Sequence, residues 1–201
     1  IFETLNIDKS YIMHLAVGTS LSIIVPTSIA SVLTHKKHKS VDISIIKTYG
    51  LFVILGVLAG TIFAALIQTK SLVLFFSLVI YFLGTYLLLF KEKTKETKKK
   101  FDFLSRLVFG FFSGFVSAAM GIAGAIINIP VLRYFGYPIK KAIGSAAAIG
   151  FIIALFGAIG FLISGTFLEA NLPLSIGFVN IPAFLIFIPI TTFMARVGAN
   201  T

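Results

Sequence analysis

The chain of 201 residues has no cysteine, no tryptophan and only seven Asp and Glu, against seventeen Lys and Arg. The absence of cysteine excludes a disulfide framework, thiolate metal sites and thiol nucleophiles. No Asp or Glu lies in the middle of an apolar run, so the sequence offers no candidate for an intramembrane carboxylate relay. It also lacks HExxH, GxSxG and paired carboxylates, and its three His are scattered. We therefore predict neither enzymatic activity nor a cofactor.

Apolar residues, by contrast, are abundant. They make up 58% of the chain, charged residues make up 12%, and the mean hydropathy is +1.04, values outside the range of soluble globular domains. Apolar runs of about 20 residues can cross a hydrocarbon core roughly 30 Å thick as helices. The sequence predicts an all-α polytopic membrane protein, with the lipid bilayer as a partner and unbroken spans near residues 15–34, 48–67, 72–90, 142–164 and 174–195. Gly56 and Gly60 form a GxxxG pattern, which favours close helix packing.

The net charge of +10 does not indicate a nucleic-acid partner, because the basic residues lie in short loops beside the apolar runs. Short loops rich in Lys and Arg remain in the cytoplasm when a membrane protein inserts. We therefore predict a multi-pass protein of the cell membrane. Its basic loops, at residues 35–40, 91–106 and 133–141, are expected to face the cytoplasm.

The apolar stretch 104–146 is broken by glycines and by Pro130. Irregular backbone at membrane depth is tolerated only where protein buries it or where it lines a cavity, so a break of this kind points to a site. If residues 104–135 crossed the membrane once, the 17 Lys and Arg would be split 11 to 6 between the two sides. If they formed a re-entrant pair of half-helices that turns near residues 121–124, the split would be 15 to 2. The asymmetry of basic loops favours the re-entrant arrangement.

A short internal repeat separates the chain into two halves. The sequence AVGTS at residues 16–20 resembles AIGSA at 142–146, and each opens a long apolar run that is followed by a loop and a further run. With a re-entrant element between them, the two copies have opposite orientations, as in many secondary transporters. We predict a first repeat with a cytoplasmic basic linker, residues 1–100, and a second repeat, residues 101–201. The first is expected to be incomplete at its N-terminus and the second at its C-terminus.

Three ordered motifs carry a resemblance to a known family. They are HLAVGTSLSIIVPTSIASVLTHKKHKSVD at residues 14–42, GFFSGFVSAAMGIAGAIINIP at 110–130 and KKAIGS at 140–145. Together they resemble the sulfite exporter TauE/SafE family of membrane permeases, in which each half begins with a glycine-rich element that ends in proline. Ala123 and Ala125 stand where that family commonly has glycine. The resemblance implies that the chain is an internal piece of a longer permease.

The resemblance implies transport of a small anionic substrate, sulfur-containing such as sulfite or an organosulfonate, by alternating access at a midplane site. Elementary chemistry also favours an anion, because a half-helix N-terminus inside the membrane presents N–H groups and the positive end of a dipole. Glycine there lets a ligand approach the backbone closely. The predicted substrate-binding residues are Gly18, Thr19, Ser20, Gly121, Ile122, Ala123, Gly124, Asn128, Pro130, Gly144 and Ser145.

Each assignment has a structural alternative. Gly121 and Gly124 can serve helix packing, and Asn128 can form an interhelical hydrogen bond. Hydroxyls such as those of Thr19 and Ser145 can bond to carbonyls of their own helices. At the level of function, the alternative to a transporter is a non-transporting accessory or scaffold subunit. A homo-oligomer is compatible with either function.

Overall fold

The computed structural model describes residues 10–89, 101–168, 170 and 172–200. Six of its helices are long and apolar enough to cross a membrane, and a shorter apolar helix of ten residues lies between the fourth and the fifth of them. The elements are α1 (Ile12–Lys37), α2 (Ile43–Leu66), α3 (Thr69–Leu89), α4 (Phe103–Met120), α5 (Ala125–Tyr134), α6 (Ile139–Phe167), β1 (Ser175–Ile176), β2 (Val179–Asn180) and α7 (Ile181–Asn200). The predicted all-α polytopic membrane fold is confirmed.

Short polar side chains define where three of the helices begin. The Asp42 carboxylate accepts a hydrogen bond from the backbone N–H of Ser44 at 3.0 Å and caps α2. The Asp102 carboxylate caps α4 in the same way. The Asn180 side chain accepts from the N–H of Ala183 at 3.0 Å at the start of α7. These oxygens satisfy N–H groups that have no partner within the first turn of a helix.

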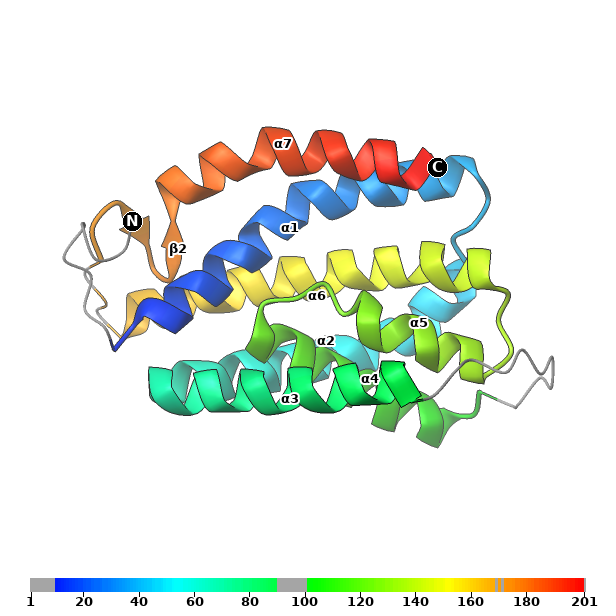
Figure 1. The fold of residues 1–201 in the computed structure, drawn as a ribbon, viewed down its shortest axis with the longest axis horizontal. Coiled ribbons are helices and arrows are strands. Elements are labelled where there is room, and N and C mark those ends of the chain that lie inside the picture. The colour runs from blue at the N-terminus through cyan, green and yellow to red at the C-terminus, as the bar shows by residue number, and fades with distance from the viewer. Residues whose placement is uncertain (1–9, 90–100, 169, 171, 201) are drawn as a thin grey trace.

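The helices run in two opposite directions (Figure 1). Helices α2, α4 and α6 begin at one end of the bundle, where α1, α3, α5 and α7 end. Of the ten Lys and Arg in the described part of the chain, Lys70 lies at the opposite end. The other nine lie at or near the first end, which we call the basic end: Lys36, Lys37, Lys39, Lys47, Arg106, Arg133, Lys140, Lys141 and Arg196. Of the basic loop predicted at 91–106, residues 91–100 lie outside the described part.

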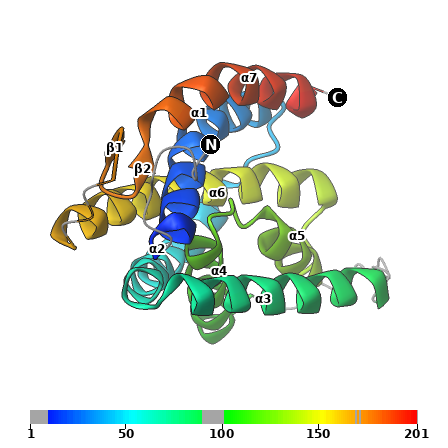
Figure 2. The same cartoon turned by 60° about the vertical axis from the view of Figure 1, so that its left-hand side comes forward.

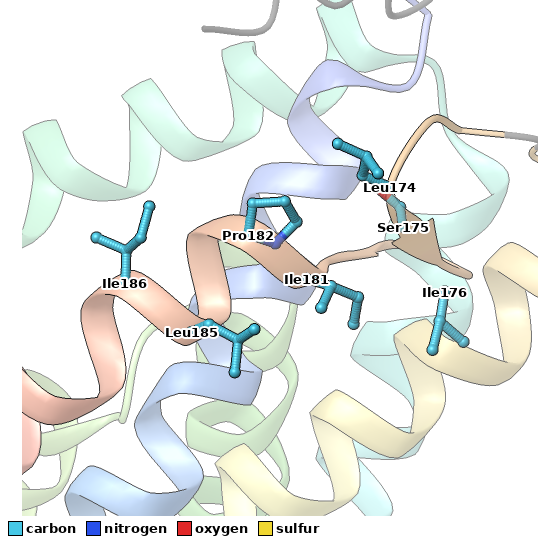
Figure 3. Close-up of a pocket in the computed structure, with 7 residues that line it drawn as sticks. All are labelled: Leu174, Ser175, Ile176, Ile181, Pro182, Leu185 and Ile186. Atoms are coloured by element: carbon cyan, nitrogen blue, oxygen red, sulfur yellow. The ribbon is translucent and has the colours of Figure 1, made fainter.

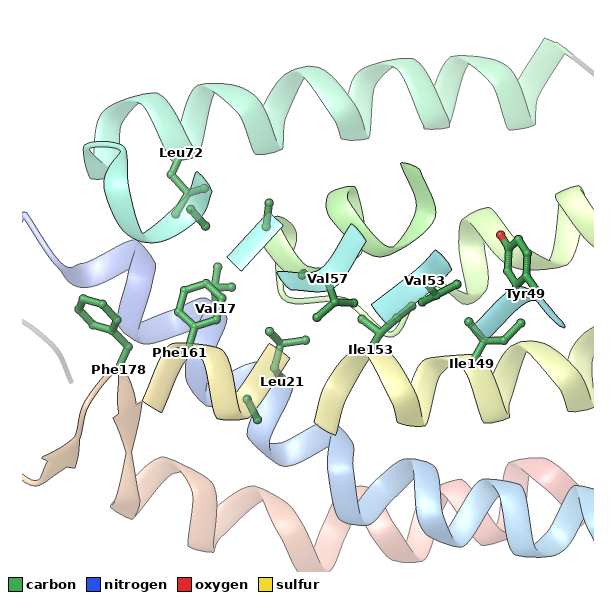
Figure 4. Close-up of a cluster of buried hydrophobic side chains, with 14 of the residues drawn as sticks. Val17, Leu21, Tyr49, Val53, Val57, Leu72, Ile149, Ile153, Phe161 and Phe178 are labelled. Carbon is green, nitrogen blue, oxygen red and sulfur yellow. The ribbon is translucent and has the colours of Figure 1, made fainter. Parts of the chain in front are cut away.

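The core lies where α1, α2 and α6 meet (Figure 4). Leu21 of α1, Val57 of α2 and Ile153 of α6 are among its fully buried side chains. On its other side α2 packs closely on α4, where Gly56 and Gly60 lie directly against the backbone carbonyls of Phe111 and Phe115. The GxxxG pattern therefore serves helix packing, as predicted.

Helices α3 and α7 form the outer surface of the bundle (Figure 2). In the most apolar segment of α3 almost all residues are left unburied, and in that of α7 all of them are. The inner face of α3 packs on the α4–α5 pair, where Phe75 contacts Phe115. Phe75 also contacts Phe63 of α2, close to the α2–α3 turn. Exposed faces this apolar are suited to lipid or to further transmembrane segments rather than to water.

The last helix begins later than the sequence indicates. The sequence predicts a span over 174–195, whereas α7 begins at Ile181 and is preceded by the two-stranded β1–β2 hairpin. Asn180 caps the helix, and Pro182 lies in its first turn. Proline is tolerated there because the N–H that it lacks would have no partner within the helix. Local turn chemistry thus overrides the apolar character of these residues.

Candidate functional site

The broken stretch forms a helical hairpin whose turn lies at residues 121–124, which we call the tip. Gly121 ends α4 in the left-handed conformation, with φ of +71°, and the N–H groups of Gly121 and Ile122 bond to the Ala118 and Ser117 carbonyls. Gly124, with φ of +69°, begins α5. Glycine occupies both positions because side chains with a Cβ rarely adopt this conformation. The break is therefore encoded by two glycines, as the sequence predicts.

Helix α5 returns to the end of the bundle where α4 began. The ring of Phe101, just before α4, stacks on that of Phe135, just after α5, with 4.3 Å between their centroids. The re-entrant geometry inferred from the charge count is thus present in the fold. At about 1.5 Å per residue, the ten residues of α5 span roughly 15 Å, half of a hydrocarbon core. The N-terminus of α5 consequently lies inside the bundle.

The tip is held between α1 and α6. The Ser20 hydroxyl donates to the Gly121 carbonyl at 2.8 Å. Gly121 lies so close to Val17 that a methyl group on it would come within 3.0 Å of the Val17 Cα. On the other side the Ala123 carbonyl lies against Gly150 of α6. The structure therefore brings the predicted residue Ser20 to the predicted turn.

Asn128 is fully buried and joins three helices. Its amide oxygen accepts from the Tyr49 hydroxyl at 2.9 Å and from the Ser113 hydroxyl at 2.8 Å. Its amide nitrogen donates to the Gly124 carbonyl at 3.0 Å. The interhelical hydrogen bond considered from the sequence is therefore present, and direct contact of Asn128 with a substrate stays a prediction.

A second polar side chain of α4, Ser117, lies beside the tip. Its hydroxyl is fully buried and has no hydrogen-bond partner among the described residues. It lies against Gly124, where a methyl group would come within 2.8 Å of the hydroxyl oxygen. The N–H groups of Ala125 and Ile126, the first two of α5, likewise have no acceptor in the described part of the chain. Unpaired donors and a helix N-terminus together can hold a negative charge.

Four predicted residues lie in two clasps, each a hydroxyl bonded to the backbone ahead of a helix. At the end opposite the basic end, Thr19 Oγ1 accepts from the Asn180 N–H at 2.9 Å, and Gly18 lies against the Phe178 carbonyl. At the basic end, Ser145 Oγ accepts from the Asp42 N–H at 3.0 Å, and Gly144 lies against the Ser40 carbonyl. Because α1 and α6 are antiparallel, the two clasps lie toward opposite ends of the bundle. The first copy of the repeat also contacts the tip, through Val17 and Ser20.

The predicted residues thus separate into a tip group and the two clasps. The tip group is Gly121, Ile122, Ala123, Gly124, Ser20 and Asn128, with the half-buried Pro130 further along α5. Sequence reasoning missed Tyr49, Ser113 and Ser117. The two serines are four residues apart and therefore share a helix face, which was a usable signal. Nothing comparable in the sequence marks Tyr49, which comes from a different helix.

The described charged residues lie away from the tip, and all of them except Lys70 lie at or near the basic end. The described acidic residues are Asp42 and Asp102, and Lys141 pairs with Asp42 across 3.5 Å at the surface, a contact that contributes little to stability. In the loop after α5, burial and then the charge of Asp42 raise the pKa of the Tyr137 phenol, against the opposing effect of Arg106. Tyr137 therefore stays neutral at physiological pH. Within the described residues, no group of three or more His, Cys, Asp or Glu could hold a metal ion.

A shallow apolar groove lies elsewhere, between the β-hairpin and the first turns of α7 (Figure 3). Its volume is about 670 Å³, and it is lined by Leu174, Ser175, Ile176, Ile181, Pro182, Leu185 and Ile186. Ser175 is the polar member of this lining, and its hydroxyl donates to the Pro173 carbonyl. The groove therefore offers hydrocarbon contacts and not the chemistry of an anion site.

Comparison with known proteins matches the chain to the sulfite exporter TauE/SafE family over residues 5–201. The chain belongs to this family. A probable membrane transporter protein of Haemophilus influenzae is 28% identical to this TauE/SafE chain over 195 residues, which are 97% of the chain and 74% of the relative. One of Methanocaldococcus jannaschii is 28% identical over 184 residues, 91% of the chain and 68% of the relative. No solved structure gave a significant match to this TauE/SafE chain.

Proposed function

We propose that this TauE/SafE chain is part of a permease that moves a small anion, sulfur-containing such as sulfite or an organosulfonate, with the α4–α5 tip as half of its binding site. The observation that carries the proposal is the N-terminus of α5, which lies inside an apolar bundle at the break of a span. Its first two N–H groups have no acceptor among the described residues, and the described carboxylates lie away from it at the basic end. The relatives' name of probable membrane transporter supports transport rather than enzymatic activity.

The clasps support a proposal about mechanism. Thr19 and Ser145 make the same contact at opposite ends of antiparallel helices, and Gly18 and Gly144 approach a carbonyl in the same way. In addition, α7 runs alongside α1 from the Thr19 clasp, as α2 runs alongside α6 from the Ser145 clasp. We propose that these pairs are two inverted repeats and that they exchange access to the tip between the two sides of the membrane. The basic end is proposed to face the cytoplasm, with the protein in the cell membrane.

The alternative function is an accessory or scaffold subunit. The observation that favours it is the unburied apolar surface of α3 and α7, which could pack on another protein or on a second copy of the chain. This alternative gives no reason for unpaired donors at the tip, because a scaffold gains nothing from polar groups that lack partners.

The test is flux through the purified full-length protein in proteoliposomes. Radiolabelled sulfite and a radiolabelled organosulfonate are supplied on one side, and entry is followed against protein-free vesicles. We expect saturable entry that a second small anion competes for, with the substrate recovered chemically unchanged. Absence of protein-dependent flux for every small anion tried would favour the scaffold, and chemical conversion of the substrate would indicate an enzyme.

A further inference from the structure

Three buried side-chain polar atoms have no hydrogen-bond partner among the described residues: Arg106 Nε, Thr192 Oγ1 and Ser117 Oγ. Ser117 differs from the other two residues because the whole of its side chain is buried. Ser113, one turn earlier on α4, donates to Asn128, and Ser22 and Thr61 donate to carbonyls of their own helices. Ser117 is equally buried, yet its hydroxyl has no partner among the described residues. A buried polar group without a partner costs the full free energy of its desolvation, and alanine there would remove that cost. The hydroxyl therefore destabilises the protein in this conformational state. Its presence is explained if it forms a hydrogen bond in another conformational state.

The position of the hydroxyl supplies that role. It lies on the inner side of Gly124, the residue that begins α5, close to where a side chain on Gly124 would stand. Gly124 has no side chain, and in this structure the Ser117 hydroxyl, the Asn128 amide nitrogen and the end of the Ile153 side chain surround that position. The N–H groups of Ala125 and Ile126 lie within the next two residues and are also unbonded in the described part of the chain. Three neutral donors are thus gathered around the start of one helix.

We propose that Ser117 is a substrate-contacting residue whose hydroxyl donates a hydrogen bond to an oxyanion bound at the N-terminus of α5. The inference rests on the proposed function of the tip. It narrows the substrate to ions with several acceptor oxygens, because donors on α4 and α5 must be met at the same time. All the donors are neutral, and the described Lys and Arg lie at or near the two ends of the bundle. Such a site binds an oxyanion by hydrogen bonds and the helix dipole, and it releases the ion readily.

The site is closed in this structure. Ser117 lies against Gly124, and the Ile153 side chain of α6 comes to the same side of that glycine, within 2.7 Å of where its Cβ would stand. Around the tip, Ile122, Ala123 and Ala125 are only partly covered, and Ile126 is 46% exposed. The oxyanion therefore reaches Ser117 in a state in which the tip has moved away from α4. Such movement is what a carrier with alternating access requires.

The test compares Ser117→Ala with Ser113→Ala in the full-length protein. Because its hydroxyl is unpaired, Ser117→Ala is expected to leave the melting temperature unchanged or raise it, while the KM for sulfite flux rises about tenfold or more. Ser113→Ala deprives the Asn128 oxygen of a donor and is expected to lower the melting temperature by about 2–4 °C. Ser77→Ala is the matched control, since this exposed hydroxyl on α3 bonds only to its own helix at Val73. Ser77→Ala should change neither the melting temperature nor the KM.

The outcomes separate the two proposals. Saturable flux in the wild type with an unchanged KM in Ser117→Ala overturns the role of Ser117 and leaves the proposed function standing. A Ser117→Ala variant that melts as low as Ser113→Ala with the wild-type KM assigns Ser117 a structural role and also overturns the inference. Absence of flux for every oxyanion in the wild type overturns the proposed function, and the role of Ser117 with it.

Discussion

At the scale of single residues, the amide of Asn128 determines how the tip is held. Both lone pairs of its oxygen are taken, by Tyr49 and Ser113, which leaves the nitrogen to face the Gly124 carbonyl. The amide therefore fixes the start of α5 relative to α2 and α4. A residue of this kind acts by positioning the donors of the tip, whether or not it also contacts the substrate.

Removing one of those donors gives a first prediction. Tyr49→Phe deletes the hydroxyl that bonds to Asn128 in a fully buried place, and a net loss of about 1 kcal/mol is expected. This corresponds to a melting temperature lower by about 2–4 °C, measured by thermal unfolding of the purified protein. Tyr81→Phe is the control, because Tyr81 is 67% exposed on α3. A Tyr49→Phe variant that melts with the wild type would show that the hydrogen bond contributes nothing.

The residues of the tip were predictable from the sequence to different degrees. Gly121 and Gly124 could be found, because glycines at a break in an apolar run indicate a turn that protein must bury. Tyr49 could not, because its partner is 79 positions away and nothing local marks the pairing. The same limit applies to Thr19 and Ser145, whose contacts come from loops that lie far off in the sequence. Hydroxyls were predictable as polar groups in spans, but their partners depend on the tertiary fold.

At the scale of elements, the α4–α5 hairpin is the feature that sets the topology. Both of its ends lie at the basic end, so residues 35–40 and 133–141 lie on the same side, with α4, one of the six membrane-crossing candidates, paired with α5 in the hairpin. The sequence predicted this topology because basic residues are costly to translocate, so their distribution among the loops indicates how often the chain crosses the membrane. It did not predict the late start of α7, because capping by Asn180 and the β-hairpin depend on local turns and not on hydropathy.

Cysteine labelling tests this topology in intact cells. Residues 1–201 contain no cysteine, so His38→Cys, Lys70→Cys and Lys140→Cys each introduce the single thiol of this part of the protein, at an exposed position. We expect a membrane-impermeant maleimide to label Lys70→Cys from outside and to label the other two only after permeabilisation. The reason is that His38 and Lys140 both lie at the basic end, on either side of the hairpin in the sequence. Labelling of Lys140→Cys and His38→Cys from opposite sides would contradict the hairpin topology.

At the scale of the whole molecule, two antiparallel helices, α1 and α6, form the centre. Each is joined to a parallel neighbour through a clasp, α7 through Thr19 and α2 through Ser145. The tip enters between α1 and α6, with Gly121 against Val17 and the Ala123 carbonyl against Gly150. A shift of one helix pair against the other would therefore change the surroundings of the tip directly. This is the arrangement that a site with alternating access needs.

The outer surface follows from the same arrangement. The faces of α3 and α7 are apolar and unburied, and the apolar groove of Figure 3 lies at the start of α7. Composition predicted that such surface exists but not which helices carry it, because α3 and α7 are no more apolar than the helices of the core. Burial is decided by which faces carry the small residues that permit close packing, such as Gly56, Gly60 and Gly114.

The tip is proposed to bind a small anion, and protection of a cysteine at the tip by anions tests this binding most directly. Ala123→Cys places a thiol at a partly exposed position between Gly121 and Gly124, and Lys140→Cys serves as a control away from the tip. Labelling rates with a small methanethiosulfonate reagent are measured against increasing concentrations of an unreactive organosulfonate and of sulfate. We expect at least one of these anions to slow the labelling of Ala123→Cys in a saturable manner and to leave the labelling of Lys140→Cys unaffected. Rates at Ala123→Cys that stay constant at every anion concentration would contradict the proposed binding.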